Sequence, residues 1–433
     1  MKKYSLIAAA IAGALVATPS FAVDYFGYFR AGTALSSNGT GDASYEKQKV
    51  GRLGNENDNY SEFGFGKDLQ TGEQTWRVES MIASGNSGTN GWQDGDFNVA
   101  QYNVQATGLF SFDRQATVWA GKRYYQRKDV HITDFYFLNT SGTGGGIENI
   151  SVGNQKLSLA LIDHSSSKQK TLDGKEWVRV PGQNPSSPDG WKEQDKYKED
   201  EVKAYVADVR LANIGLWEDA TLEIAGVYNF ATGTASGDKN VKADDGVLAT
   251  AILHQNMSNG FNQTVVQYGN SSYGAQMADL GNGGNFDRKD DANNGAQGVR
   301  LLNWGVISLG DKWEMGHQLL AARSTDAAIS ATNRAKTDHD LISAVIRPMY
   351  QWTTTVRTIF EAGAYQENYS NAGNKKGSKF TVAQAFSMGE GFFARPEIRV
   401  YGTYLDDRSD SAQLSDKSKK KEFLLGVQVE AWF

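Results

Sequence analysis

The feature that most constrains the fold is an alternation of apolar and polar side chains with a period of two residues. It is clearest at the carboxyl terminus, and it recurs at 157–161 and 222–228. One parity there holds Phe423, Leu425, Val427, Val429, Ala431 and Phe433, and the other holds Leu424, Gly426, Gln428, Glu430 and Trp432. Successive side chains of a β-strand point to opposite faces. The pattern therefore predicts strands whose two faces meet different surroundings.

Two architectures carry such strands, a soluble sandwich with a dry core and a membrane barrel with a water-filled lumen. Long polar connections at about 164–203, 279–298 and 405–421 alternate with short turns, and no change of composition marks a domain boundary. This arrangement favours the barrel, whose long loops face water at one end. At about 22 residues for each strand and its connection, the chain predicts roughly 18 or 19 strands, enough to leave an aqueous channel.

The first 22 residues have the pattern of an export signal. Two lysines are followed by an apolar run from Leu6 to Ala17, and small residues end the segment at Ala22. This pattern predicts a secretory signal peptide over residues 1–22, cleaved before a single barrel domain over 23–433. A membrane anchor fits less well because the apolar run is short and ends in a proline.

Composition excludes several classes of protein and of site. The chain has no cysteine, so it has neither disulfides nor thiolate chemistry. Its 44 basic and 50 acidic residues give a net charge of −6, which argues against a nucleic-acid partner. The five histidines are scattered, without metal-ligand spacing, and no Gly-x-Ser-x-Gly motif of a hydrolase occurs. We therefore expect no metal, no cofactor and no enzymatic activity.

Large rings on the polar parity of the strands are candidate ligand contacts. Trp432 has the parity of Gln428 and Glu430, so we expect it to point into the lumen. The same neighbourhood of ring and charge occurs at Tyr28 with Arg30 and at Tyr60 with Glu62. A pyranose stacks its CH-rich face on a ring while its hydroxyls bond to charged groups, so these pairs suit a saccharide. The alternative is that the rings belong to the aromatic girdles at the membrane surfaces.

The densest cluster of rings and charges lies at 119–137. The alternation is lost between Arg127 and Asp134, where charges of both signs mix with rings, and this predicts a loop. A loop of this composition can fold inward and narrow a pore. The alternative is an exposed surface loop on which His131 simply faces solvent.

Short blocks of sequence match one family in order along the chain. The longest is Trp119-Ala-Gly-Lys-Arg123 with Gln126-Arg127, Asp129-Val-His131 and Asp134-Phe-Tyr136. Others are Val23-Asp24-Tyr-Phe-Gly27-Tyr28-Phe-Arg30, Arg52-Leu-Gly-Asn-Glu56, Glu148-Asn-Ile150, Gly260-Phe261-Asn262, Ile346-Arg-Pro-Met-Tyr350 with Trp352, and Arg395-Pro-x-Ile-Arg-Val400. On these blocks the chain resembles the maltoporins, sugar-specific trimeric porins of the Gram-negative outer membrane.

The resemblance implies an all-β fold, an 18-stranded antiparallel transmembrane β-barrel whose third loop folds into the channel. It implies facilitated diffusion of maltose and maltodextrin-type oligosaccharides by a homotrimer, with the oligosaccharide solute and outer-membrane lipid as partners. Departures from the family pattern at Asn57, Ala100 and 138–139 leave the exact sugar open. The alternatives are a porin for a different oligosaccharide and a general-diffusion porin, which filters solutes by size and charge.

The resemblance also assigns residues to a sugar path. An aromatic track would comprise Tyr28, Tyr60, Phe261, Trp352 and Trp432, with Trp92 reaching in from a neighbouring subunit. A polar track and constriction would comprise Arg30, Arg52, Glu62, Arg127, Asp129, His131, Asp134 and Tyr136. The parity of the strands supports four of these rings but not Trp352, which has the parity of apolar Ile342 and Ile346.

Overall fold

The computed structural model describes the chain in several stretches. They are residues 23–39, 44–86, 97–165, 169–180, 183, 186–187, 190–200, 202–234, 242–281, 286, 288, 290–330 and 333–433. The signal peptide expected at 1–22 and the ring expected at Trp92 lie outside the described residues. Among the residues that are described, no helix is long and apolar enough to cross a membrane.

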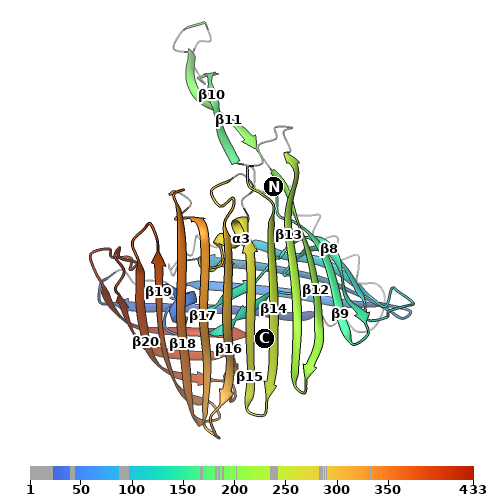
Figure 1. Ribbon diagram of the computed structural model, residues 1–433, viewed down its shortest axis with the longest axis vertical. Helices are drawn as coiled ribbons and strands as arrows, with labels where there is room; N and C mark the ends of the chain where they lie inside the picture. The colour runs from blue at the N-terminus through green and yellow to red at the C-terminus, as the bar shows by residue number, and fades with distance from the viewer. Residues whose placement is uncertain are drawn as a thin grey trace.

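Eighteen strands of the described chain pair antiparallel in one closed sheet (Figure 1). They are β1 (Asp24–Ser36), β2 (Asn59–Thr71), β3 (Gln74–Asn86), β4 (Asn98–Thr107), β5 (Thr117–Arg123), β8 (Gly142–Val152), β9 (Gln155–Asp163), β12 (Val202–Trp217), β13 (Ala220–Thr234), β14 (Gly246–Met257), β15 (Gly260–Asn270), β16 (Gln297–Ser308), β17 (Trp313–Ala328), β18 (Lys336–Thr353), β19 (Val356–Tyr369), β20 (Lys375–Ser387), β21 (Glu397–Asp407) and β22 (Lys421–Trp432). Closure comes from β1, which pairs with β2 on one side and with β22 on the other. The expected 18-stranded antiparallel barrel is confirmed.

The two faces of the barrel wall have opposite character, as the alternation predicts. On β22 the apolar side chains of Phe423, Leu425 and Val427 are about half exposed, whereas Gln428 and Glu430 are buried. An outward apolar band and a polar interior are typical of barrels that span an outer membrane. The strands therefore present their apolar parity to lipid and their polar parity to the inside.

The two ends of the barrel differ in the length of their connections. At one end neighbouring strands are joined by short turns such as 72–73, 153–154 and 258–259. The longest connection at the other end carries a hairpin of β10 (Gln169–Arg179) and β11 (Trp191–Asp200), which projects beyond the barrel in Figure 1. The connection expected at 279–298 begins earlier, after β15, because Ser271–Ala275 form the short helix α3.

The first connection, between β1 and β2, contacts the buried side of the wall. It contains the single-turn helix α2 (Lys47–Val50). Beyond this helix the carbonyl of Leu53 accepts a hydrogen bond from Lys379 Nζ at 2.7 Å, and its N–H donates to Glu361 at 2.9 Å. Lys379 and Glu361 are buried on β20 and β19. The sequence did not predict these contacts.

The third of the long connections, residues 124–141 between β5 and β8 (hereafter the third connection), also contacts buried side chains of the wall. Its elements are β6 (Lys128–Val130), the 3-10 helix η1 (His131–Thr133) and β7 (Phe135–Leu138). The hydroxyl of Thr133 donates to Gln318 on β17 at 2.6 Å, and Gln267 on β15 donates to the carbonyl of Phe137 at 2.9 Å. The loss of alternation between Arg127 and Asp134 thus coincides with a segment that is not part of the barrel sheet.

Candidate functional site

Three of the expected rings lie side by side where the barrel closes. Tyr28 on β1 is opposite Trp432 on β22, and the ring centroids of Tyr28 and Tyr60 are 6.1 Å apart. All three rings are half-buried; Tyr60 and Trp432 have the parity of buried Glu62 and Glu430, and Tyr28 has the parity of half-buried Arg30. Strand pairing fixes their order, because β2, β1 and β22 are neighbours in the wall.

The line of rings continues through two residues from connections. The centroid of the His131 ring lies 5.6 Å from that of Trp432 and 5.6 Å from that of Phe393. Phe393 stacks on Phe261, with 6.5 Å between the centroids. Tyr60 lies near the long-connection end of β2, whereas Phe261 follows a short turn. The rings therefore extend from the end with long connections toward the end with short turns.

Phe393 is a ring that sequence reasoning missed. It lies in the connection between β20 and β21, where no strand parity applies. The signal that could have found it is a pair of adjacent large rings, Phe392 and Phe393, directly before the matching block that starts at Arg395.

Trp352 does not join the other rings. It ends β18 on the parity of Ile342 and Ile346, and 56% of its surface is exposed. Its indole N–H donates to the hydroxyl of Thr358 at 2.9 Å, and its ring lies against Tyr350 at 4.5 Å between centroids. Pairing of β18 with β19 is irregular between Gln351 and Thr353, yet the ring still contacts Tyr350, which has the outward parity.

Arg52 connects the aromatic residues to the buried charges. Its guanidinium pairs with Glu56 at 2.8 Å and with Glu430 at 2.9 Å, and it donates to the hydroxyl of Tyr28 at 2.8 Å. Both carboxylates and Arg52 are almost completely buried. These contacts fix a cation and a hydroxyl at the edge of the line of rings.

Arg30 and Lys47 both contact Asp134 of the third connection. Arg30 pairs with Asp58 at 2.7 Å and lies 3.5 Å from Asp134. Lys47 Nζ lies 2.6 Å from Asp134 and 2.8 Å from Glu56. Sequence reasoning missed Lys47, because only the folding of two separate connections brings it to Asp134.

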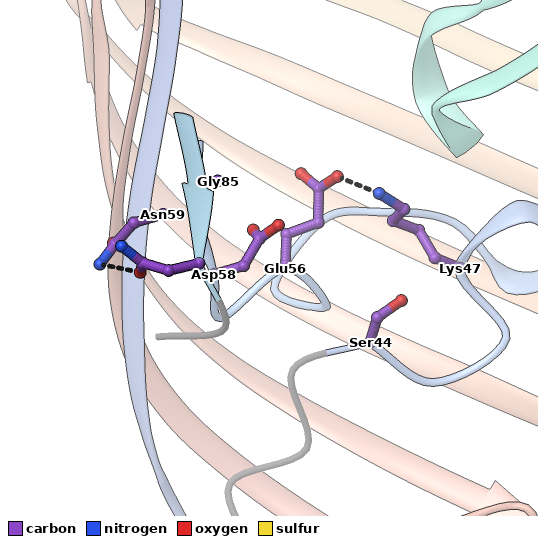
Figure 2. A pocket seen from close by; sticks show the side chains of 7 residues that line it. Ser44, Lys47, Glu56, Asp58, Asn59 and Gly85 are labelled. Carbon is purple, nitrogen blue, oxygen red and sulfur yellow. Dashed lines mark hydrogen bonds and ion pairs between the residues drawn. The ribbon is translucent and has the colours of Figure 1, made fainter. Parts of the chain in front are cut away.

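A cavity of about 330 Å³ opens beside these pairs. Figure 2 shows Lys47 and Glu56, from two stretches of the first connection, pointing toward each other. Near them Asn59 donates to Asn86 at 3.3 Å. The residues that line the cavity are Ser44, Lys47, Glu56, Asp58, Asn59, Gly85 and Asn86. The lining offers hydrogen-bond donors and acceptors and no large apolar side chain.

Arg127 is held between two tyrosine rings. Its guanidinium carbon lies 3.7 Å from the ring centroid of Tyr124 and 4.7 Å from that of Tyr136. The Tyr124 hydroxyl is 3.0 Å from a carboxylate oxygen of Glu62, which also accepts from Tyr60 at 2.6 Å. Among the described residues no carboxylate forms an ion pair with Arg127, so the edge of the guanidinium keeps its donors for other partners.

In the third connection, the environment shifts the pKa values of Asp129 and His131. Asp129 lies opposite Tyr136 in the β6–β7 pair, and burial together with the nearby Asp134 raises the pKa of its carboxyl. Burial lowers the pKa of His131 well below its usual range. Its ring nitrogens also face Arg52 at 3.5 Å and Arg395 at 3.3 Å, which disfavours a positive charge on the imidazole.

The arrangement as a whole suits a neutral, hydroxyl-rich ligand. Rings offer faces on which CH groups stack, and the neighbouring cations and carboxylates offer donors and acceptors to hydroxyl groups. In the part of the chain that is described, no group of three His, Asp or Glu residues could hold a metal ion.

The chain is similar to known proteins over most of its length. The LamB porin family model matches residues 23–433. A maltoporin of Vibrio cholerae is 56% identical, over 100% of both chains. A maltoporin of Photobacterium profundum is 38% identical, covering 95% of this chain and 94% of the relative. Among solved structures, OccK2 (OpdF) of Pseudomonas aeruginosa is 7% identical with a TM-score of 0.49, covering 95% of this chain and 97% of that one.

Proposed function

Because the chain belongs to the LamB porin family, we propose that it is a sugar-specific channel for maltose and maltodextrin-type oligosaccharides. The barrel lies in the Gram-negative outer membrane, and the solute diffuses through it down its own gradient. The observation that carries the proposal is the line of rings from Tyr60 through Tyr28 and Trp432 to Phe261, beside fixed charges. The relatives named maltoporin support maltodextrins as the solute.

Transport proceeds by exchange of weak contacts along this line. Each glucose unit stacks on a ring, while its hydroxyls exchange hydrogen bonds with partly exposed charges such as Arg30 and Asp134. The measured steps between neighbouring ring centroids are 5.6–6.5 Å, so a sliding oligosaccharide meets a new ring before it leaves the old one. Binding at each position has to be weak, because a site that holds the sugar tightly blocks conduction.

The third connection forms the constriction of the channel in this proposal. Its contacts with buried side chains of β15 and β17 support a position inside the barrel. Tyr136 narrows the passage, and Arg127, fixed between two rings, presents its donors to passing hydroxyls. Asp129 and Asp134 supply acceptors on the same segment.

Four further features belong to the same proposal. The family resemblance supports removal of residues 1–22 on export and assembly into a homotrimer. Trp92 of a neighbouring subunit would then add a ring at the channel entrance. Trp352, which faces away from the other rings, contributes to the outer aromatic girdle and not to the sugar path.

Blockage of single-channel current by graded maltodextrins tests the function. We expect saturable blockage by maltotriose, and we expect Trp432→Ala to weaken it by roughly two- to twelvefold, the effect of about 0.5–1.5 kcal/mol of ring contact. Trp352→Ala is the matched control, since it removes the same side chain from the outward face and should leave blockage unchanged. Equal effects of the two substitutions would contradict the path proposed here.

Liposome swelling separates this channel from a general-diffusion porin. A sugar-specific channel admits maltodextrins faster than other oligosaccharides of equal mass, whereas a general porin shows rates that fall smoothly with solute mass. A panel of maltose, sucrose, cellobiose and chitin oligomers therefore also identifies the preferred sugar.

A further inference from the structure

A second cavity, of about 420 Å³, has Arg127 in its lining and extends toward the short turns. It is an open recess lined by residues 126–128 and by residues of β8, β9, β12 and β13. Lys156 lines it two residues after the turn 153–154, which places the cavity in the short-turn half of the barrel. Its charged lining residues are Arg127, Lys128, Glu148, Lys156, Arg210 and Glu223.

The carboxylates of this cavity are already neutralised. Glu148 pairs with Arg123, a residue outside the lining, and also accepts from Gln126 at 2.7 Å. Glu223 pairs with Lys128 at 2.6 Å. Of the four lining cations, Lys128 is therefore paired with a carboxylate that also lines the cavity.

Two of the lining cations have no ion-pair partner among the described residues. Arg210 pairs with Asp208 at 2.8 Å. Among the described residues no carboxylate forms an ion pair with Arg127 or with Lys156. Among the described residues Lys156 Nζ donates to neutral groups, the amide of Gln115 and the hydroxyl of Ser151 at 2.9 Å. Asp113 and Asp129 interact electrostatically with Lys156 and Arg127, respectively, but form no ion pair with them. Two cations without an ion-pair partner attract an anion, because solvent screens charges less in a recess than on an open surface.

Two asparagine amides add neutral hydrogen-bonding groups to the cavity. Asn149 and Asn213 line it, and both have a left-handed backbone with φ of 60°. Each sits at an irregularity of strand pairing, Asn149 between β8 and β9 and Asn213 between β12 and β13. Such irregularities re-aim side chains. Within the described chain neither amide has a hydrogen-bond partner, so both NH₂ groups keep their donors.

Unlike the sugar path, the lining of this cavity contains no aromatic residue. A neutral pyranose would find no ring to stack on. We infer that this cavity is an anion-binding subsite that takes a phosphate group, either free or as the phosphate monoester of a sugar. Arg127 offers the planar donor pair that matches phosphate oxygens, and Lys156 supplies a second charge. The inference extends the proposed function, since Arg127 borders both the constriction and the cavity.

The experiment uses the full-length channel in planar bilayers at constant ionic strength, with no sugar present. Inorganic phosphate and glucose 6-phosphate are added in turn to each side. We expect both to reduce the current in a saturable way, and to do so at lower concentration when added from the short-turn side than from the other side. We expect Lys156→Gln to raise the half-blocking concentration by roughly two- to fivefold. Blockage by glucose 6-phosphate alone, weakened in Lys156→Gln, assigns the cavity to phosphorylated sugars and also supports the inference.

Three controls make the result decisive. Lys175→Gln removes an exposed lysine of the β10–β11 hairpin and should leave phosphate blockage unchanged, and Lys156→Arg should retain it. Maltotriose blockage should be the same in Lys156→Gln as in the unsubstituted channel, which shows that the barrel is folded. The inference is overturned if phosphate acts no differently from chloride, or if Lys156→Gln and Lys175→Gln behave alike. Loss of the proposed sugar function would instead appear as absent maltotriose blockage with phosphate blockage intact.

Discussion

Trp352 and Trp432 both end a barrel strand, yet they face opposite sides of the wall. Trp432 follows Glu430 by two residues and contacts His131, whereas Trp352 shares the parity of exposed Ile346. A shift of one residue along a strand moves a side chain from the lumen face to the lipid face. At this scale the role of a ring follows from its position along the strand, and residue type alone does not reveal it.

Tyr124 is the residue whose substitution tests how Arg127 is held. Tyr124→Leu removes the ring on which the guanidinium lies, and we expect maltotriose blockage to weaken by roughly two- to thirtyfold, the effect of about 0.5–2 kcal/mol of cation–π contact. Tyr124→Phe keeps the ring and loses only the hydroxyl that contacts Glu62, so its effect should be clearly smaller. Single-channel current measures both, and equal losses would show that the ring does not position Arg127.

At the scale of elements, the first connection packs closely against the wall because Gly363 has no side chain. An added Cβ at Gly363 on β19 would lie 2.1 Å from the carbonyl oxygen of Val50, closer than any van der Waals contact allows. The backbone of α2 therefore lies directly on the strand, and this position brings Lys47 and Arg52 to their partners. Parity does not predict such a fit, because the close approach involves backbone from two distant segments.

Gly363→Ala should consequently displace the first connection. We expect a loss of about 1–3 kcal/mol of stability, seen as a lower midpoint of thermal unfolding in detergent, together with weaker maltotriose blockage. Gly226→Ala on β13 is the matched control, because nothing lies within 4 Å of the added Cβ. If both substitutions shift the midpoint equally, the contact with Val50 does not hold the connection.

At the scale of the whole molecule, the channel combines a wall that excludes lipid with connections that set its selectivity. Pairing of β1 with β22 closes the wall, and the backbone N–H of Gly27 donates to the carbonyl of Phe433 at 3.0 Å to complete the seam. Ion selectivity is then a property of the interior as a whole, since cations and carboxylates from many strands and two connections face the same passage.

Ion selectivity should depend on pH through Asp129. Its pKa is raised, so its negative charge is present only above that raised value and is lost as the pH falls through it. We expect the ratio of cation to anion permeability to fall as the pH is lowered through that raised pKa, before ordinary aspartates are protonated, and Asp129→Asn to abolish this part of the change. The reversal potential in a salt gradient measures the effect, and an unchanged pH profile in Asp129→Asn would contradict it.

The sequence by itself determined the barrel, its approximate number of strands and the inward parity of Tyr28, Tyr60, Phe261 and Trp432, because a period of two is a local property of each strand. It did not determine how residues of the connections meet, since these segments have no period and their partners lie far away in the chain. Only the tertiary structure placed Phe393 beside Phe261, Lys47 beside Asp134 and Tyr124 beneath Arg127. These contacts form when separate connections pack against the wall and against one another.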